Sequence, residues 1–248
     1  MALDYTIQLP CSVRQTLPEE KLFALVKRQD KVAAAIARFR VQYPHEAPDR
    51  ILAAGRLTIS VRTPDGDARE MPVSLAQLLR SVAPLDDVKH ACGTCAANLT
   101  GRDFGCIGRV DYPVARAAEE WLLARLPDDY WDGNLVMLFK SLADLEVDGA
   151  PVEAVRARGA AFEASAPVSR QWGGLLTKKQ ISSSQLLHML AFGGHLSARQ
   201  AQLYTRLLGL LAIPLEPPSG DESIEALKTF LCAIAIAGRL NAGVLIDA

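Results

Sequence analysis

Residues 90–113 of this chain read HACGTCAANLTGRDFGCIGRVDYP and contain three of the five cysteines in the 248-residue sequence. The three are Cys92, Cys95 and Cys106, and His90 lies just upstream of them. The segment has no helical or strand period of hydrophobic residues, because glycine recurs at positions 93, 101, 105 and 108. The pattern therefore predicts a loop rather than a helix or a strand, and it predicts a site that uses thiols.

The spacing of these residues indicates a metal site. A C-x2-C pair such as Cys92 and Cys95 directs two sulfur atoms toward one ion, and Gly93 between them is expected to use its tolerance of positive φ. Cys106 lies among glycines that let backbone N–H groups point at its sulfur and stabilise thiolate charge. With His90 as fourth ligand, the set matches a structural zinc site of the Cys3His type.

The fourth ligand and the cofactor have alternatives. His90 is close enough to Cys92 in sequence to strain the geometry, and four side chains can take its place: Asp103, Asp111, Cys11 and Cys232. With no fourth protein ligand, zinc keeps an open position, as catalytic zinc sites do. An iron–sulfur cluster is the alternative cofactor, although the C-x2-C-x2-C run of ferredoxins is absent. A redox dithiol at Cys92 and Cys95 is a further alternative, without the strand-then-helix context of thioredoxin-like motifs.

The composition is that of an ordinary folded chain. Half of the residues are hydrophobic, 22% are charged and the formal net charge is −1, so no global field attracts nucleic acid or an anionic membrane. The first twenty residues lack the pattern of a secretory signal, and no apolar run approaches the ~20 residues of a membrane span. We expect a cytoplasmic protein with no membrane contact and no dedicated nucleic-acid binding. Thiols stay reduced in the cytoplasm, which favours metal ligands over disulfides.

The first forty residues predict one strand and one long helix. Loose alternation over residues 3–14 predicts a strand, which Pro10 restricts to a sheet edge or to a short length. The capping-box pattern of residues 16–19 begins an amphipathic helix that runs to about Arg40. Its polar face carries six basic side chains: Lys21, Lys27, Arg28, Lys31, Arg38 and Arg40. Such a face can bind phosphates, but it is more commonly solvated surface.

A hairpin follows, and shorter elements flank the cysteine segment. Alternation over residues 57–61 and 68–73, with Pro-Asp-Gly-Asp between them, predicts two antiparallel strands. Ser74 begins a short helix that leads into the cysteine segment. Beyond it we expect a helix, then a segment of helical or strand type, then a small strand and turn, over residues 114–126, 135–142 and 145–149.

The last part of the chain is predicted to be helical. Three helices are expected over residues 182–192, 197–211 and 222–240, with Ser197 and Asp221 as N-caps of the second and third. One weak helix is expected over residues 152–163. The fold class is therefore α+β, with two domains. A mixed α/β domain over residues 1–165 combines a small antiparallel sheet, a long helix and the metal loop, and a helical bundle occupies residues 166–248.

Three functions fit these observations. In the leading hypothesis the protein is not an enzyme; zinc orders the glycine-rich loop, and the protein acts by binding another macromolecule, either a protein partner or a second copy of itself. In the second, an enzyme reacts at an open metal or cluster position bounded by His90, Asp103 and Arg109. In the third, Cys92 and Cys95 form a thiol redox pair.

Overall fold

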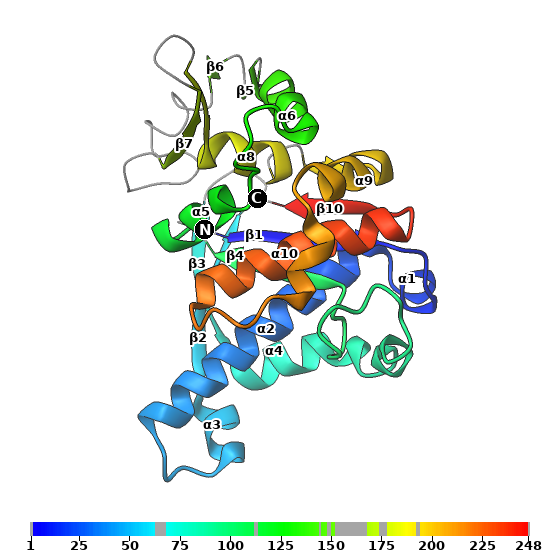
Figure 1. Ribbon diagram of the computed structural model, residues 1–248. Coiled ribbons are helices and arrows are strands. Elements are labelled where there is room, and N and C mark those ends of the chain that lie inside the picture. The colour runs from blue at the N-terminus through cyan, green and yellow to red at the C-terminus, as the bar shows by residue number, and fades with distance from the viewer. Residues whose placement is uncertain are drawn as a thin grey trace. The chain divides into compact units, whose positions relative to one another are not determined.

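The computed structural model describes residues 2–62, 68–111, 114–143, 145–147, 150–151, 168–173, 178–191 and 194–247. These residues form nine helices, ten strands and three short 3₁₀ segments (Figure 1). The helices are α1 (Ser12–Thr16), α2 (Glu19–Gln42), α3 (Pro48–Ala54), α4 (Leu75–Val82), α5 (Arg116–Ala124), α6 (Gly133–Ala143), α8 (Ser183–Ala191), α9 (Ala198–Leu207) and α10 (Glu222–Arg239). The strands are β1 (Ala2–Gln8), β2 (Arg56–Arg62), β3 (Ala68–Ser74), β4 (Ile107–Asp111), β5 (Glu146–Val147), β6 (Ala150–Pro151), β7 (Ser169–Trp172), β8 (Lys179–Ser182), β9 (His195–Leu196) and β10 (Gly243–Asp247). The 3₁₀ segments are η1 (Ala83–Leu85), η2 (Lys89–Cys92) and η3 (Leu210–Leu215).

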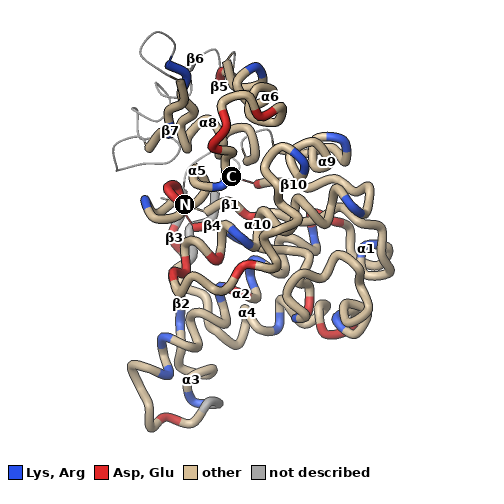
Figure 2. The backbone as a smooth tube through the Cα atoms, viewed as in Figure 1, with Lys and Arg blue, Asp and Glu red and all other residues tan. Residues whose placement is uncertain are grey.

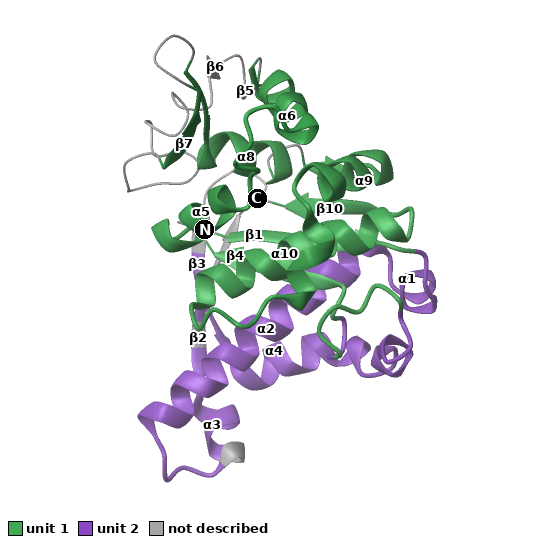
Figure 3. Ribbon diagram, in the orientation of Figure 1, with its two compact units in different colours: residues 1–9, 96–101, 105–248 green, residues 10–95, 102–104 purple. Residues whose placement is uncertain are grey.

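Helices and antiparallel sheets are both present, which confirms the predicted α+β class. The chain packs as two compact units (Figure 3). Unit 1 contains residues 1–9, 96–101 and 105–248, and unit 2 contains residues 10–95 and 102–104. The predicted domain boundary at residue 165 and the predicted helix over 152–163 lie outside the described residues, and both stay predictions.

The main sheet of unit 1 has the strand order β4-β1-β10-β9. Strand β1 pairs antiparallel with β10 on one side and with β4 on the other, so that Tyr5 lies opposite Ile246 and opposite Gly108. Residues 3–7 are all buried, as expected of an inner strand. Of the two options that Pro10 left open, an edge position or a short strand, the edge position is wrong: β1 is an inner strand of seven residues. Pro10 follows the end of β1, so its missing N–H removes nothing from the ladder.

Helix α10 packs against this sheet, on the side that faces the viewer in Figure 1, and contacts β1, β4 and β10. The Asp221 side chain accepts hydrogen bonds from the N–H groups of Ser223 and Ile224, at 2.8 and 3.2 Å, so the predicted N-cap is confirmed. The ring of Phe230 on α10 meets the ring of Tyr5, with centroids 5.0 Å apart. Burial of this aromatic pair joins the helix to the middle of the sheet.

Strand β4 corrects the prediction that residues 90–113 form a loop throughout. Residues 107–111 are extended, because β1 offers them a partner that lies about a hundred residues away in sequence. Gly108 does not break the strand. A Cβ atom at this position would lie 2.3 Å from the Tyr5 hydroxyl oxygen, so the missing side chain leaves room for the Tyr5 ring. This glycine marks close cross-strand packing and not a turn.

Outside the undescribed segment 152–167, the helices predicted after residue 114 are present, and strands accompany them. The predicted helices correspond to α5, α8, α9 and α10, and the ambiguous segment 135–142 is helical as α6. Ser197 caps α9, since its hydroxyl accepts the N–H of Gln200 at 3.3 Å. Strands β9 and β10 also lie in this part of the chain, and neither was predicted from the sequence.

Unit 2 contains the 24-residue helix α2 and the hairpin β2–β3. The hairpin has the predicted antiparallel pairing, while residues 63–67 of its turn lie outside the described residues. Ser74 caps α4 as predicted, and its hydroxyl accepts the N–H of Gln77 at 3.2 Å. Helices α2, α3 and α4 pack around a small core of Ala35, Ile51 and Leu75.

The capping box predicted at residues 16–19 does not form. Residues 12–16 make the separate short helix α1, in which the Thr16 hydroxyl donates to the Ser12 carbonyl at 3.2 Å. Helix α2 begins at Glu19, after Pro18, without a side-chain cap. The Thr16 hydroxyl is thus used inside α1.

Among the helices of the described residues, none combines the length and the hydrophobicity needed to cross a membrane.

We predict that Gly108→Ala destabilises the protein. The added methyl group meets the Tyr5 ring, and overpacking of this kind costs about 1–3 kcal/mol of unfolding free energy. Urea or thermal unfolding of the full chain measures the change. Gly133→Ala is the matched control, because nothing lies within 4 Å of the position that its Cβ would occupy. Equal stability of the two variants would contradict the packing role of Gly108.

Candidate thiol centre and binding groove

The C-x2-C pair forms a tight turn in unit 2. Cys92 is the last residue of η2 and is buried, and the N–H of Cys95 donates to its carbonyl oxygen at 3.2 Å. Gly93 has φ −62°, a value that any residue adopts, and an added Cβ there would meet nothing within 4 Å. The expectation that this turn uses positive φ at Gly93 is therefore wrong. The turn is closed by its backbone hydrogen bond.

The sulfur of Cys92 accepts a hydrogen bond from the backbone N–H of Phe104. Phe104 is in the left-handed region, with φ 57°, and its ring is buried. A non-glycine residue in this conformation costs of order 1–3 kcal/mol and persists only where surrounding packing holds it. An N–H directed at sulfur was expected around Cys106. That expectation for Cys106 stays a prediction; the N–H of Phe104 serves Cys92, and this donor is a strained residue.

Three acidic groups surround the Cys92 thiol. Burial is the largest effect on the pKa of Cys92 and raises it, and the Phe104 N–H acts in the opposite direction. Coulombic interactions with Cys95, Asp103 and Cys11 raise this pKa further. Cys11 takes part because it is the N-cap of α1, which packs against η2. We call Cys11, Cys92, Cys95 and Asp103 the thiol cluster.

His90 and Cys106 complete the predicted zinc ligands, and neither belongs to the thiol cluster. His90 is exposed while Cys92 is buried, and since a 3₁₀ helix turns about 120° per residue, side chains two positions apart leave it on different sides. Cys106 belongs to unit 1, where its carbonyl oxygen accepts the N–H of Ile7 at 3.0 Å. The roles predicted for His90 and Cys106 stay predictions.

Asp111 and Cys232, two further candidates for the fourth ligand, interact with neighbours in unit 1. Asp111 forms an ion pair with Arg109 at 2.7 Å, on the exposed side of β4. Cys232 lies on α10, where burial raises its pKa and the nearby Arg125 charge lowers it. All five cysteines are thiols rather than disulfides. Across the part of the chain that the structure describes, no three His, Cys, Asp or Glu side chains converge closely enough to hold a metal ion.

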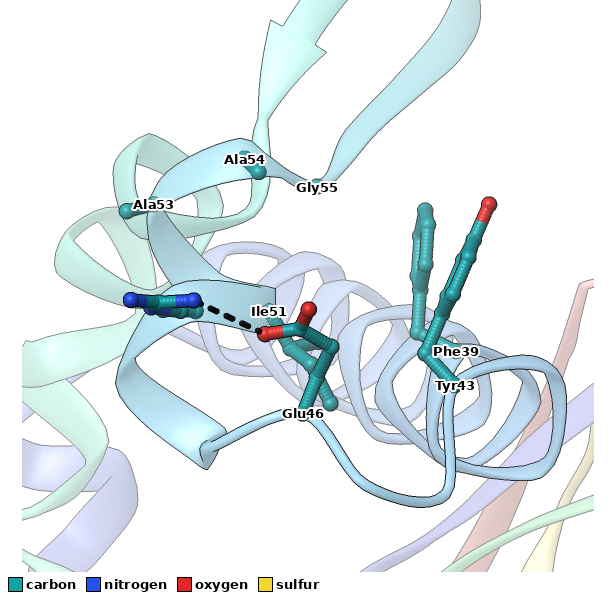
Figure 4. Close-up of a pocket in the computed structure, with 8 residues that line it drawn as sticks. Phe39, Tyr43, Glu46, Ile51, Ala53, Ala54 and Gly55 are labelled. Atoms are coloured by element: carbon teal, nitrogen blue, oxygen red, sulfur yellow. Dashed lines mark ion pairs between the residues drawn. The ribbon is translucent and has the colours of Figure 1, made fainter.

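A second feature of unit 2 is a groove between the end of α2 and α3, with a volume of about 430 Å³ (Figure 4). Phe39 and Tyr43 stack along one side, with ring centroids 6.2 Å apart and ring planes 19° apart. Ile51 and residues 53–55 of α3 and its C-cap complete an apolar lining. Glu46 and Arg50 form an ion pair at 3.8 Å within the lining. The volume falls in the range of pockets that bind small ligands or side chains.

Basic residues surround this groove. Arg38 and Arg40 are exposed and lie about 100° to either side of Phe39 around α2, and exposed Arg56 follows the last lining residue. Arg50 contributes a fourth positive charge. Among the described lining residues, Glu46 supplies the carboxylate, and it forms the ion pair with Arg50. Figure 2 marks Lys and Arg positions in blue along α2. The basic face of α2 was predicted from the sequence, but nothing in the sequence indicated the groove beside it.

Comparison of the chain with protein-family models, with curated proteins and with solved structures found no match.

We predict that in metal-free protein the Cys92 thiol ionises at higher pH in the folded state than in the unfolded chain. Only the thiolate reacts with iodoacetamide, so a raised pKa shifts the rise of the alkylation rate toward higher pH. Mass spectrometry of the Cys92 peptide across a pH series, with and without denaturant, measures the shift. Restricted access alone would slow the reaction equally at every pH. A midpoint at or below that of the unfolded chain would contradict the prediction.

Proposed function

We propose that this protein binds a structural zinc ion through Cys92 and Cys95, and that it acts in the cytoplasm by binding another macromolecule. The observation that supports the zinc site most directly is the Phe104 N–H directed at the Cys92 sulfur, with Cys95, Asp103 and Cys11 in electrostatic range. Hydrogen bonds from backbone N–H groups to sulfur are the usual support of metal-bound thiolates. Zinc would deprotonate the thiols that bind it, and its positive charge would offset the negative charge gathered there.

Binding requires a local rearrangement. The side chains of the thiol cluster have to close around the ion, through rotamer changes at the partly exposed Cys11 and Cys95. Metal binding supplies folding free energy that can drive such a change. Two sets of four ligands are possible, and both contain Cys92 and Cys95. The set predicted from the sequence adds Cys106 and His90. The set formed by the thiol cluster adds Cys11 and Asp103.

The redox alternative receives less support. Catalytic and redox cysteines have a lowered pKa, so that the thiolate is present at neutral pH. Burial and neighbouring negative charges act in the opposite direction on Cys92. A thiol with a raised pKa can still serve as a metal ligand, because the bound ion itself promotes its deprotonation.

We predict one zinc ion per chain in protein purified without chelator, and its loss in Cys92→Ser and Cys95→Ser. Elemental analysis measures the metal, and thermal unfolding measures a loss of stability of several kcal/mol, because structural zinc contributes directly to folding. Cys232→Ser is the matched control, since Cys232 lies on α10 in unit 1. A visible absorption band would show that the bound cofactor is an iron–sulfur cluster and not zinc. Absence of any bound metal, together with unchanged Cys92→Ser stability, would overturn the proposal.

The same measurement separates the two ligand sets. Loss of zinc in Cys106→Ser and His90→Ala, with retention in Cys11→Ser and Asp103→Asn, identifies the set that the sequence predicts. The reverse pattern identifies the thiol cluster.

A further inference from the structure

We propose that the groove between α2 and α3 binds an acidic peptide segment that inserts a large apolar side chain between Phe39, Tyr43 and Ile51. This inference rests on one half of the proposed function, namely that the protein acts by binding a macromolecule, and it names the chemistry of the partner. It is independent of the zinc site, because every residue of the groove lies outside the thiol cluster.

The interior of the groove favours an apolar group. Six of its eight lining residues are apolar or aromatic, and its base is continuous with the Ala35, Ile51 and Leu75 core. The Tyr43 ring is 46% exposed, so an inserted side chain would bury aromatic surface that now faces water. Aromatic residues with this combination of packing and exposure commonly carry much of the binding energy at an interface.

The rim of the groove favours negative charge. Exposed Arg38 and Arg40 are the chain neighbours of Phe39, and exposed Arg56 follows the lining residue Gly55. Within the lining, Arg50 forms an ion pair with Glu46. Positive charge around an apolar interior complements an amphipathic segment whose polar positions are Asp or Glu. Helical segments bind such grooves through apolar anchors spaced three or four residues apart.

Two other occupants fit the surface less well. The phosphates of a nucleic acid would contact only the basic residues and would leave the apolar interior unfilled. A second copy of this chain related by a twofold axis would place the same arginines against each other, and like charges at an interface oppose association. An acidic peptide satisfies both the interior and the rim.

The experiment measures binding of a fluorescein-labelled helical peptide to the full chain by fluorescence anisotropy. The peptide carries leucine or tryptophan anchors at positions i and i+4 among Glu and Asp residues. One control peptide replaces the acidic residues by Lys, and another replaces the anchors by Ala. We expect binding of the first peptide alone, with an affinity that falls as salt is raised.

Variants of the protein locate the site. Tyr43→Ala removes an exposed part of the wall, and the double variant Arg38→Glu/Arg40→Glu reverses the rim charge; each should weaken binding about tenfold or more, a loss typical of hot-spot residues. Tyr43→Phe should retain binding. The matched control Lys21→Glu/Arg28→Glu makes the same charge change on exposed residues nearer the start of α2 and should leave the affinity unchanged. Thermal unfolding verifies that each variant is folded.

Three results would overturn the inference. They are equal binding of the acidic and the Lys peptides, binding that the Tyr43 and arginine variants do not weaken, and displacement of the acidic peptide by a single-stranded oligonucleotide that itself binds more tightly. Self-association weakened by the rim variants would also overturn it in favour of a dimer contact. Zinc content is measured on the same samples and on Cys92→Ser, so failure of the zinc site and failure of peptide binding are seen separately.

Discussion

The structure of unit 1 depends on the pairing of β1 with β4 and β10. These three strands come from residues 2–8, 107–111 and 243–247, so the sheet unites the two ends of the described chain with a segment from its middle. Tyr5 occupies the centre, with Gly108 beside it in the sheet and Phe230 packed over it. Contacts of such long sequence separation are slow to form, because the loop between the strands must close first. Changes at this centre are therefore expected to affect the whole unit.

The pairing of β1 with β4 also determines the conformation of the last part of the cysteine segment. Its last part, from Ile107, is a strand of the sheet, whereas Cys92 and Cys95 lie in unit 2, in a turn closed by a backbone hydrogen bond. Phe104 lies between these parts in sequence and adopts a left-handed conformation that directs its N–H at the Cys92 sulfur. Strain at a residue that serves a thiol is characteristic of sites that a fold holds for a purpose. Zinc is the simplest ion that would use this arrangement.

Unit 2 contains both proposed sites, at separate places along one chain segment. The start of α1 and the end of η2 hold the thiol cluster, and the far end of α2 with α3 forms the groove. A metal at the first would stabilise the unit without taking part in recognition at the second. In the proposed binding mode, the basic face of α2 is used at its last two turns, where Arg38 and Arg40 lie beside Phe39 in sequence.

The sequence by itself determined the local elements: the hairpin β2–β3, the N-caps Ser74, Ser197 and Asp221, and the long helix α2 follow from residues within a few positions of one another. Only the tertiary structure decided that β1 is an inner strand, that residues 243–247 are extended, that Gly108 makes room for Tyr5, and that Cys11 lies near Cys92. Each of these depends on a partner distant in sequence, and a hydrophobic period or a cysteine spacing carries no information about which distant segment that partner will be.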